Sequence, residues 1–361
     1  MLTPPRPSSG STDRRTSRGS VVLFRCDGTV ATGLGHLSRC LALAEALEEL
    51  GCACAFAGSY AAGAVALLQG ADLPFEEVPS LAESDASSET LGQSDAIQAR
   101  AIVIDSYAIS QEHIAAVSRR GLSAVLIDDF ARFPEYPCAV VLNFTVNAPQ
   151  LPYPPGGATY LLGPGYFLVR RRLRQLRSRL ESRSASVRRI LIAVGGTDRH
   201  NLSLRIVQAL QKVSPGLVVR VVAALQFGAV GEMTDLLSSF VAGSGLVTNQ
   251  KDLAEEFSRA DACISGGGLT KYEAAYLGVP GAVLSQTAEQ AEETVAFSAR
   301  GLACDLGLGP GIESTQLEDG LRQFLNDADL RARLVQTGLA TFPADSTLRA
   351  AEAITECLPL N

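Results

Sequence analysis

The sequence predicts an α/β protein made of two Rossmann-like halves, each with a parallel sheet. The chain has 361 residues, which is more than one hydrophobic core usually organises. Short apolar runs alternate with longer helical runs, a pattern typical of a parallel sheet covered by helices on both faces. The alternation stops at an arginine-rich stretch, residues 168–189, and then restarts. This break separates the two halves.

In the first half, each predicted strand is apolar almost throughout, as in VVLFRC and AIVID. A helical pattern follows three of these six strands, and glycine ends the first predicted helix at Gly51. The predicted strands are 21–26, 52–58, 101–105, 124–129, 139–143 and 159–163, and the predicted helices are 36–50, 61–70 and 110–121.

The second half repeats this rhythm. Because the carboxyl ends of parallel strands collect ligands, we expect a site in an interdomain cleft that both sheets face. The predicted strands are 189–196, 217–224, 262–268 and 281–285, with an extended segment at 240–249, and the predicted helices are 201–213, 251–260, 270–278, 288–301 and a helical region over about 315–355.

Composition sets the domain boundaries. Residues 1–19 are rich in Ser, Pro and Arg and lack an apolar core, so we expect a disordered tail, with a targeting role as the alternative. The N-terminal domain is then 20–167 and the C-terminal domain 188–345. An Arg-rich linker, 168–187, joins them, and a C-terminal tail helix, 346–361, ends the chain.

The arginine-rich stretch 168–189 holds nine arginines. A solvated helix and linker is the favoured interpretation, since runs of charge mostly lie on surfaces. The alternative is a basic face that docks weakly on an anionic membrane or a partner. The oligomeric state does not follow from the sequence.

The whole chain has a formal charge of −7, which does not indicate binding of nucleic acid. No apolar run reaches the length of a membrane span. The eight cysteines form no C-x-x-C pair and mostly lie in apolar runs. Buried, reduced thiols in a cytoplasmic protein fit this usage better than a disulfide framework or a zinc site.

The segment GLGHLSRCLALAEAL, residues 33–47, places one of only three histidines at the start of a helix. Gly33 and Gly35 predict a tight turn after the first strand. A helix N-terminus disfavours a cationic imidazole, so a neutral His36 is expected to act as general base. Arg39, one turn further on, is a candidate to hold a phosphate or a carboxylate. A plain helix cap is the alternative role of His36.

Other polar side chains follow the predicted strands 101–105 and 124–129. Asp105 ends the first of these strands and is a candidate substrate-binding residue. Tyr107 follows as a candidate catalytic residue that would stack on or hydrogen-bond a sugar. The alternative for Asp105 is a structural role. Asp128 and Asp129 are consecutive, so only one of them is expected to face the cleft, and they do not make a convincing catalytic pair.

The strongest local motif is SGGGLTKYEAAYLG, residues 265–278, in which a buried strand enters a glycine-rich turn before a helix. Backbone N–H groups of Gly267, Gly268, Leu269 and Thr270 are expected to point at a diphosphate, with Thr270 as the expected N-cap residue. Glu273, one turn into the helix, is a candidate acceptor for a ribose diol. A tight turn with a surface glutamate is the alternative.

The segment VGGTDRHN, residues 194–201, repeats this arrangement one unit earlier. Gly195, Gly196 and Thr197 follow a predicted strand and are expected to face the same ligand. His200 is predicted to face solvent, and His113 receives no role.

As an ordered set, these motifs resemble the nucleotide-sugar hydrolases of the pseudaminic-acid pathway and their spore-coat polysaccharide relatives. The set is GxGHxxR, IVIDSY, LIDDF followed by VVLN, LLGPGYFLVR, IAVGGTDRHN and SGGGLTKYEAAYLGVP, over about residues 20–310. The resemblance implies the two-domain GT-B glycosyltransferase fold. The C-terminal nucleotide site is similar to that of the peptidoglycan N-acetylglucosaminyltransferase.

The resemblance also implies a reaction, in which water attacks the anomeric carbon of a UDP-linked 2,4-diacetamido-2,4,6-trideoxyhexose with inversion. It implies His36 as the base that activates water and Tyr107 near the sugar. Residues 265–273 become the UDP site, with Glu273 on the ribose. Because a nucleoside diphosphate leaves readily, placed donors suffice, and neither a metal nor a cofactor is expected.

This chain departs from the family at two places. Where the family carries an Asn–Gln pair, this chain has Glu289 before Gln290, so a carboxylate replaces an amide at the sugar site. The chain also has no tryptophan, unlike the more usual form of the glycine-rich motif.

Two other functions compete with the nucleotide-sugar hydrolase. One is an inverting glycosyltransferase in which His36 deprotonates an acceptor hydroxyl, on a lipid or a glycan. The other is a binding protein that holds a nucleotide sugar without turnover. Release of the nucleotide in the absence of an acceptor discriminates among the three, because a fold alone does not.

Overall fold

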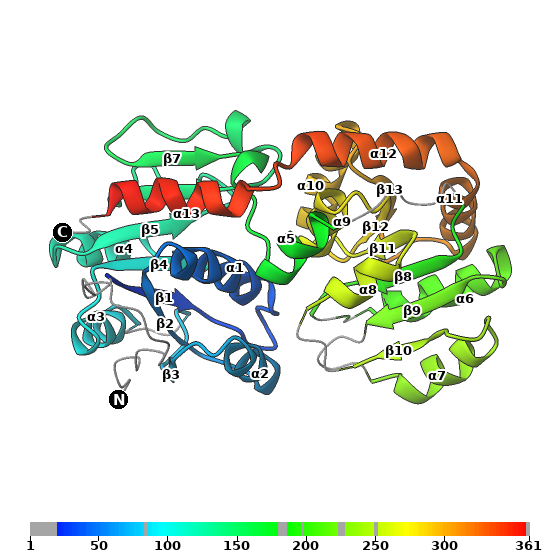
Figure 1. Ribbon diagram of the computed structural model, residues 1–361, viewed down its shortest axis with the longest axis horizontal. Helices are drawn as coiled ribbons and strands as arrows, with labels where there is room; N and C mark the ends of the chain where they lie inside the picture. Colours follow the sequence, from blue (N-terminus) through cyan, green and yellow to red (C-terminus); the bar gives the residue numbers. More distant parts are fainter. Residues whose placement is uncertain are drawn as a thin grey trace. The chain divides into compact units, whose positions relative to one another are not determined.

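The computed structural model describes residues 20–82, 86–179, 186–196, 198, 200–222, 228–248 and 252–358. The chain divides into two compact units. Unit 1 comprises Met1–Arg171 and Asp345–Asn361, and unit 2 comprises Arg172–Ala344. Each unit contains its own parallel sheet with helices, which confirms the predicted fold class (Figure 1). The predicted tail, residues 1–19, lies outside the described residues.

The sheet of unit 1 has the strand order β3-β2-β1-β4-β5-β6-β7, and all its described pairings are parallel. The register sets Phe24 opposite Phe56, and their rings stack with centroids 4.8 Å apart. The strands are β1 Val21–Cys26, β2 Ala53–Gly58, β3 Phe75–Glu77, β4 Ala101–Asp105, β5 Ser123–Ile127, β6 Val140–Asn143 and β7 Thr159–Leu162.

Helices cover the sheet of unit 1. The first and last helices, α1 (Gly35–Glu49) and α13 (Ser346–Cys357), pack against each other, with α1 on β1 and β2 and α13 on β6 and β7 (Figure 1). Residues of α4 pack with the strand residues Leu23, Ile102 and Leu126 in an apolar cluster of unit 1. The other helices of this unit are α2 Ala62–Gly70, α3 Ala86–Ala96, α4 Gln111–Arg119, and the short helices η1 Ala148–Gln150 and η2 Pro164–Tyr166.

The C-terminal helix is part of unit 1 and not a separate tail. Thr347 Oγ1 accepts a hydrogen bond from the backbone N–H of Val169 at 2.9 Å, and Ser346 Oγ donates to the carbonyl of Phe167 at 2.8 Å. Both hydroxyls are buried, so they satisfy backbone groups that water does not reach. These long-range bonds hold the start of α13 against the segment that follows η2.

The sheet of unit 2 has the order β10-β9-β8-β11-β12-β13, again parallel in every described pairing. The strands are β8 Arg189–Ala193, β9 Val218–Val222, β10 Gly245–Val247, β11 Ala262–Ser265, β12 Gly281–Ser285 and β13 Cys304–Leu308. The helices are α5 Arg171–Arg177, α6 Leu202–Val213, α7 Val230–Ser238, α8 Ala254–Arg259, α9 Leu269–Tyr276, α10 Ala288–Ala299, α11 Ser314–Asn326 and α12 Ala328–Thr341.

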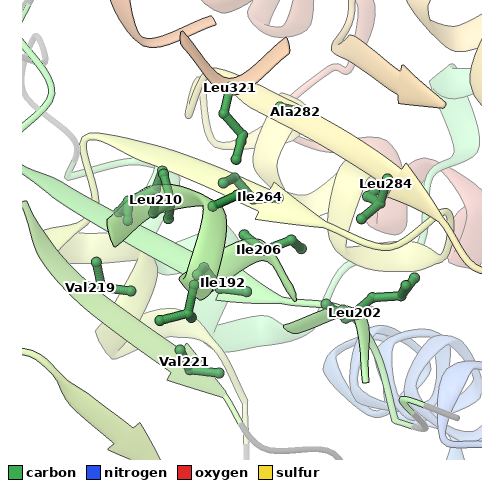
Figure 2. Packing of buried hydrophobic residues seen from close by; sticks show 14 of the residues in the cluster. Ile192, Leu202, Ile206, Leu210, Val219, Val221, Ile264, Ala282, Leu284 and Leu321 are labelled. Carbon is green, nitrogen blue, oxygen red and sulfur yellow. The ribbon is translucent and has the colours of Figure 1, made fainter. Parts of the chain in front are cut away.

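One apolar cluster holds unit 2 together. Strand residues Ile192, Val221 and Ile264 lie in this cluster with Leu210 of α6 and Leu321 of α11 (Figure 2). All five side chains have an exposed fraction of zero. Since every buried methylene stabilises by about 0.8 kcal/mol, this cluster is a principal source of the unit's stability.

In both sheets the strand order reverses beside the first strand of the unit. The chain leaves β1 toward β2 and β3 and then returns to β4 on its other side, and unit 2 does the same at β8 and β11. Such a switch point opens a crevice at the carboxyl ends of the two strands. The fold therefore predicts one ligand-binding crevice per unit, after β1 and β4 and after β8 and β11.

Several elements differ from the prediction. The region 315–355 contains α11, α12 and α13, because Asp327 ends one helix and caps the next by accepting from Leu330 N at 2.7 Å. Helices α3 and α7 and strands β3 and β13 were not predicted. Their sequences are short or carry mixed polar residues, so neither hydrophobic period stands out.

The arginine-rich joint is more ordered than a solvated linker. Arg170 and Arg171 pair with Glu45 and Glu49 of α1, at 2.8 and 2.6 Å. Further on, Arg177 donates to the carbonyl of Tyr276 at 2.6 Å and stacks on its ring at 4.4 Å. Residues 180–185 of this stretch lie outside the described part of the chain. The joint thus stabilises local structure, and docking on a membrane stays a prediction.

His113 is buried, although the sequence suggested no role for it. Its exposed fraction is 6%, and its Nε2 has no hydrogen-bond partner among the residues that the structure describes. Burial lowers the pKa of His113 to about 4, and the nearby positive charge of Arg25 acts in the same direction. The folded protein therefore keeps this imidazole neutral where an unfolded chain would protonate it.

We expect this histidine to make unit 1 sensitive to mild acid. As the pH falls from about 6.5 toward 4, the unfolded chain binds a proton that the folded unit does not, so stability falls by about 3 kcal/mol. His113→Leu should flatten the dependence of the melting temperature on pH in this window. The pKa values of Asp27 and Asp105 are lowered, so these two groups change the stability only at pH values below this window.

The matched control is His200→Leu, because His200 is exposed. Calorimetric scans between pH 7.5 and 4 compare the wild type and both variants. An equal slope in His113→Leu and in the wild type would contradict the assignment.

Candidate functional site

The first candidate site begins at the N-terminus of α1, directly after β1. Gly33 has φ +71°, in the left-handed region that favours glycine, and so turns the chain into the helix. The helix begins at Gly35, one residue earlier than predicted, and Leu34 is its N-cap without a side-chain hydrogen bond. His36 therefore lies in the first turn. Gly33 thus lies in the turn before α1, and Gly35 and His36 lie in the first turn of the helix.

His36 is held by Asp105 from the end of β4. The two atoms in contact are Nδ1 of His36 and Oδ1 of Asp105, at 2.6 Å. Arg39 Nη2 lies 3.3 Å from the same Nδ1, so the shorter contact assigns the ring proton to Nδ1. In this tautomer Nε2 carries the lone pair, which is the acceptor that a general base needs.

Arg39 holds the carboxylates around this histidine. Its Nε and Nη2 each donate to Asp105 at 2.6 Å, and its Nη1 donates to both oxygens of Asp129 at 3.0 and 2.8 Å. The Arg39 side chain is 6% exposed, and that of Asp105 is 0% exposed. In the structure Arg39 pairs with two of the chain's own carboxylates, and its contact with a substrate phosphate or carboxylate stays a prediction. Asp105 positions both His36 and Arg39, and its contact with the substrate stays a prediction.

The charges explain why a buried aspartate stays ionised here. Burial by itself would raise the pKa of Asp105, but the charges of Arg39 and His36 outweigh it and hold that pKa well below its usual value. The same carboxylates raise the pKa of Arg39 against the effect of burial. Arg39 and Asp105 therefore form a buried ion pair.

Tyr107 completes this cluster from the loop after β4. Its hydroxyl donates to Asp129 at 2.7 Å, and its ring meets the His36 ring edge-on at 4.6 Å between centroids. Desolvation and the charge of Asp129 raise the pKa of Tyr107 well above its usual value, so the hydroxyl stays protonated. Half of the side chain is exposed. Tyr107 can therefore contact a ligand but cannot act as a base.

The two consecutive aspartates take different directions, as predicted. Asp129 joins the His36 cluster, whereas Asp128 is fully buried and accepts from Arg132 Nε at 2.8 Å and from the hydroxyl of Tyr136. The participation of Asp129 was not predicted. Sequence spacing gave no sign of it, because Arg39 lies ninety residues away along the chain.

The second candidate site lies in unit 2, where loops follow β8 and β11. Gly195 has φ +134°, and Gly196 follows it, whereas the predicted contact residue Thr197 lies outside the described residues. A Cβ at Gly266 would come within 2.1 Å of the carbonyl oxygen of Val194. The two loops therefore pack against each other through backbone, which explains why glycine stands at 266.

Helix α9 starts from the second of these loops. Its N-cap is Gly268, not Thr270 as predicted, and no side chain caps it. Gly268 is exposed, and a Cβ there would meet nothing within 4 Å. The first N–H groups of a helix have no partner within the helix, so those at Leu269 and Thr270 are placed to receive an anion.

The loop after β12 supports this arrangement. Gln286 Nε2 donates to the carbonyl of Val194 at 3.1 Å, and Gln290 Oε1 accepts from Gln286 N at 3.0 Å. A Cβ at Gly267 would come within 2.5 Å of the Gln290 Cβ. Gln290 is thus a packing residue of the loops, whereas the adjacent Glu289 is exposed in the first turn of α10.

A buried lysine beneath the glycine-rich loop escaped prediction. Lys271 is 2% exposed, and its Nζ donates to the carbonyl of Gly267 at 2.8 Å and to Glu293 at 3.0 Å. Burial lowers the pKa of Lys271, although Glu293 opposes this shift. The ammonium holds the loop in place from inside. Glu273, half-buried two residues further on, stays a predicted ribose contact.

Two further observations concern the described residues as a whole. In this part of the chain, no three His, Cys, Asp or Glu side chains gather as they would around a metal ion. None of the helices that the structure describes is long and apolar enough to cross a membrane.

No family model matches the chain. The chain is similar to spore coat polysaccharide biosynthesis protein SpsG of Bacillus subtilis, with 25% identity over 222 residues, 56% of this chain and 60% of that protein. An uncharacterized protein of Methanocaldococcus jannaschii is 30% identical over 137 residues, which is 37% of this chain and 28% of that protein. Both matches span less than two thirds of the relative's length.

Solved structures give the fold. MurG of Acinetobacter baumannii has a TM-score of 0.65 and 16% identity, covering 94% of this chain and 99% of that one. The spinosyn rhamnosyltransferase SpnG, complexed with thymidine diphosphate, has a TM-score of 0.64 and 16% identity, with 92% and 100% covered. The chain has the GT-B fold of these proteins, as predicted.

We expect Arg39→Met to destabilise unit 1 by about 3–5 kcal/mol, because it leaves two buried carboxylates without their cation. Arg120→Met is the matched control, since Arg120 and Asp95 form an exposed pair and its loss should cost at most about 1 kcal/mol. Urea unfolding of both variants tests this. Equal losses would mean that Arg39 has no special structural role.

The glycine loop allows a second test. Gly266→Ala should destabilise unit 2 by about 3 kcal/mol or more, because its methyl group would collide with the Val194 carbonyl. Gly268→Ala should cost no more than about 1 kcal/mol, the loss of a good N-cap residue, because its surroundings are open. Thermal unfolding compares the two, and a reversed order would refute this packing.

Proposed function

We propose that this chain hydrolyses a nucleotide sugar, releasing a nucleoside diphosphate, with UDP as the first candidate. The observation that carries the proposal is the His36–Asp105 pair, in which a buried carboxylate orients an imidazole at a sheet's switch point. The similarity to SpsG and the GT-B fold support a role in processing nucleotide sugars. The proposed sugar is a 2,4-diacetamido-2,4,6-trideoxyhexose, made for a surface polysaccharide or a nonulosonic acid.

In the proposed mechanism, Nε2 of His36 takes a proton from water while the water oxygen bonds to the anomeric carbon. The bond between that carbon and the phosphate oxygen breaks, and the diphosphate leaves with its electron pair. The products are the free sugar, with inverted configuration, and the nucleoside diphosphate. Asp105 fixes the imidazole and stabilises its protonated form.

The charge of the cluster favours this proton transfer. With neutral His36, the ionised Asp105 and Asp129 exceed the single positive charge of Arg39 by one. Protonation of His36 balances the cluster, so the product of the transfer is stabilised where it forms.

Unit 2 is proposed to bind the nucleotide. The N-terminus of α9, without a side-chain cap, supplies N–H donors for the diphosphate, and Gly195 and Gly196 line the neighbouring loop. Glu273 is proposed to accept hydrogen bonds from the ribose. Glu289, exposed at the first turn of α10, is proposed to contact the sugar in place of the amide of the family.

A glycosyltransferase is the second candidate, because the structural neighbours include rhamnosyltransferase SpnG. There His36 would deprotonate an acceptor hydroxyl in place of water. The first experiment is to measure nucleoside-diphosphate release from a panel of nucleotide sugars without any acceptor. Rapid release supports the hydrolase, whereas binding with no release supports the transferase or a binding protein.

We expect His36→Ala to slow this release by about 10²–10⁴-fold, the usual contribution of a positioned general base. Binding of UDP, measured by calorimetry, should stay within twofold of the wild type, since the nucleotide site is proposed for unit 2. His200→Ala, at an exposed histidine, is the control. Undiminished release by His36→Ala would exclude His36 as the base.

A further inference from the structure

Two large aromatic side chains lie exposed next to His36. Tyr107 is 50% exposed and Phe130 is 52% exposed, and their ring centroids lie 5.1 Å apart. Tyr107 in turn meets the His36 ring at 4.6 Å. Side chains of this size are normally buried, so an exposed pair beside a polar cluster indicates a surface that binds a ligand.

Arg132 holds the two loops that carry these rings. Its Nη1 donates to the carbonyl of Tyr107 at 2.6 Å and its Nη2 to that of Ser106 at 3.1 Å. Its Nε donates to Asp128 at 2.8 Å, and its guanidinium lies 5.7 Å from the Tyr107 ring. The loops after β4 and β5 are therefore tied together, and the aromatic pair is ordered before any ligand binds.

The backbone shows why Phe130 stays outside. Ala131 has φ +53°, in the left-handed region that costs a residue with a Cβ about 1 kcal/mol. This turn lets Arg132 fold back onto Asp128 while Phe130 remains exposed. The turn thus satisfies the buried Asp128 through the backbone and side chain of Arg132, and it leaves the Phe130 ring on the surface beside Tyr107.

We infer that Phe130, together with the ring of Tyr107, forms a stacking surface for the pyranose ring of the substrate, and that Phe130 helps to determine sugar specificity. This inference rests on the proposed function. A pyranose presents C–H groups on its faces and polar groups around its edge. Stacked here, its apolar face meets the aromatic rings while its edge meets His36 and Asp129.

The size of the surface favours a sugar over a lipid chain. Two neighbouring rings offer contact for about one six-membered ring, and the polar cluster of His36, Arg39 and Asp129 borders them directly. A long apolar acceptor would need a longer apolar groove. The base at the edge of the surface also places the anomeric carbon where water can be activated.

The test uses Phe130→Ala, which removes the ring, and Phe130→Tyr, which keeps it. Leu50→Ala is the matched control, because Leu50 is an exposed apolar residue of the same unit at the far end of α1. Steady-state kinetics with the nucleotide sugar give KM and kcat, and calorimetry gives the affinity for the nucleotide sugar and for UDP alone.

We expect Phe130→Ala to raise KM and to weaken nucleotide-sugar binding about tenfold, with kcat changed by less than threefold. Affinity for UDP alone should not change, because the ring contacts only the sugar. Phe130→Tyr and Leu50→Ala should behave like the wild type. An unchanged KM, or equal losses for UDP and for the nucleotide sugar, overturns the inference.

Failure of the proposed function gives a different result. If the wild type neither turns over nor binds nucleotide sugars, the surface is tested with methyl pyranosides and protein labelled with ¹³C in its phenylalanine rings. Shifts of the Phe130 ring signals, identified by their absence from Phe130→Tyr, would support sugar stacking without the hydrolase. No shift with any pyranoside would overturn it.

Discussion

One buried guanidinium determines the chemistry of unit 1. Arg39 donates to Asp105 and Asp129, which follow two neighbouring strands, and thereby keeps Asp105 ionised in the core. Only because Asp105 stays charged can it fix the His36 ring with Nε2 as the acceptor. The same guanidinium sets Asp129, and through it the hydroxyl of Tyr107. Without Arg39, two buried negative charges would repel each other and the site would lose its geometry.

The two units use the same topology for different chemistry. In each sheet the strand order reverses beside the unit's first strand, and the candidate residues follow the two strands at that reversal. Unit 1 brings charged side chains there, which suits proton transfer. Unit 2 brings glycines and a helix N-terminus, which suits binding an anion through backbone N–H groups. A base and an anion site are the two parts that cleavage of a nucleotide sugar requires.

The glycines of unit 2 serve packing as well as binding. Gly266 and Gly267 have no room for a Cβ, because Val194 of a neighbouring loop and Gln290 of α10 lie against them. Gly268 alone is open, and it is the residue at the helix N-cap. Lys271 then ties the loop to α10 from inside through Glu293. A rigid loop matters here, since donors that are already in place lose little entropy when an anion binds.

The sequence by itself determined the fold class and most strands, because uniformly apolar runs such as VVLFRC and GAVLS leave a buried parallel strand as the only good solution. It also indicated His36, Tyr107 and the glycine loops, since local turn chemistry marks them. Only the tertiary structure decided the roles of Arg39, Asp105 and Asp129, because their pairing joins residues up to ninety positions apart. Burial of His113 and Lys271, and the exposure of Phe130, likewise depend on which loops meet, and hydrophobic periodicity carries no information about that.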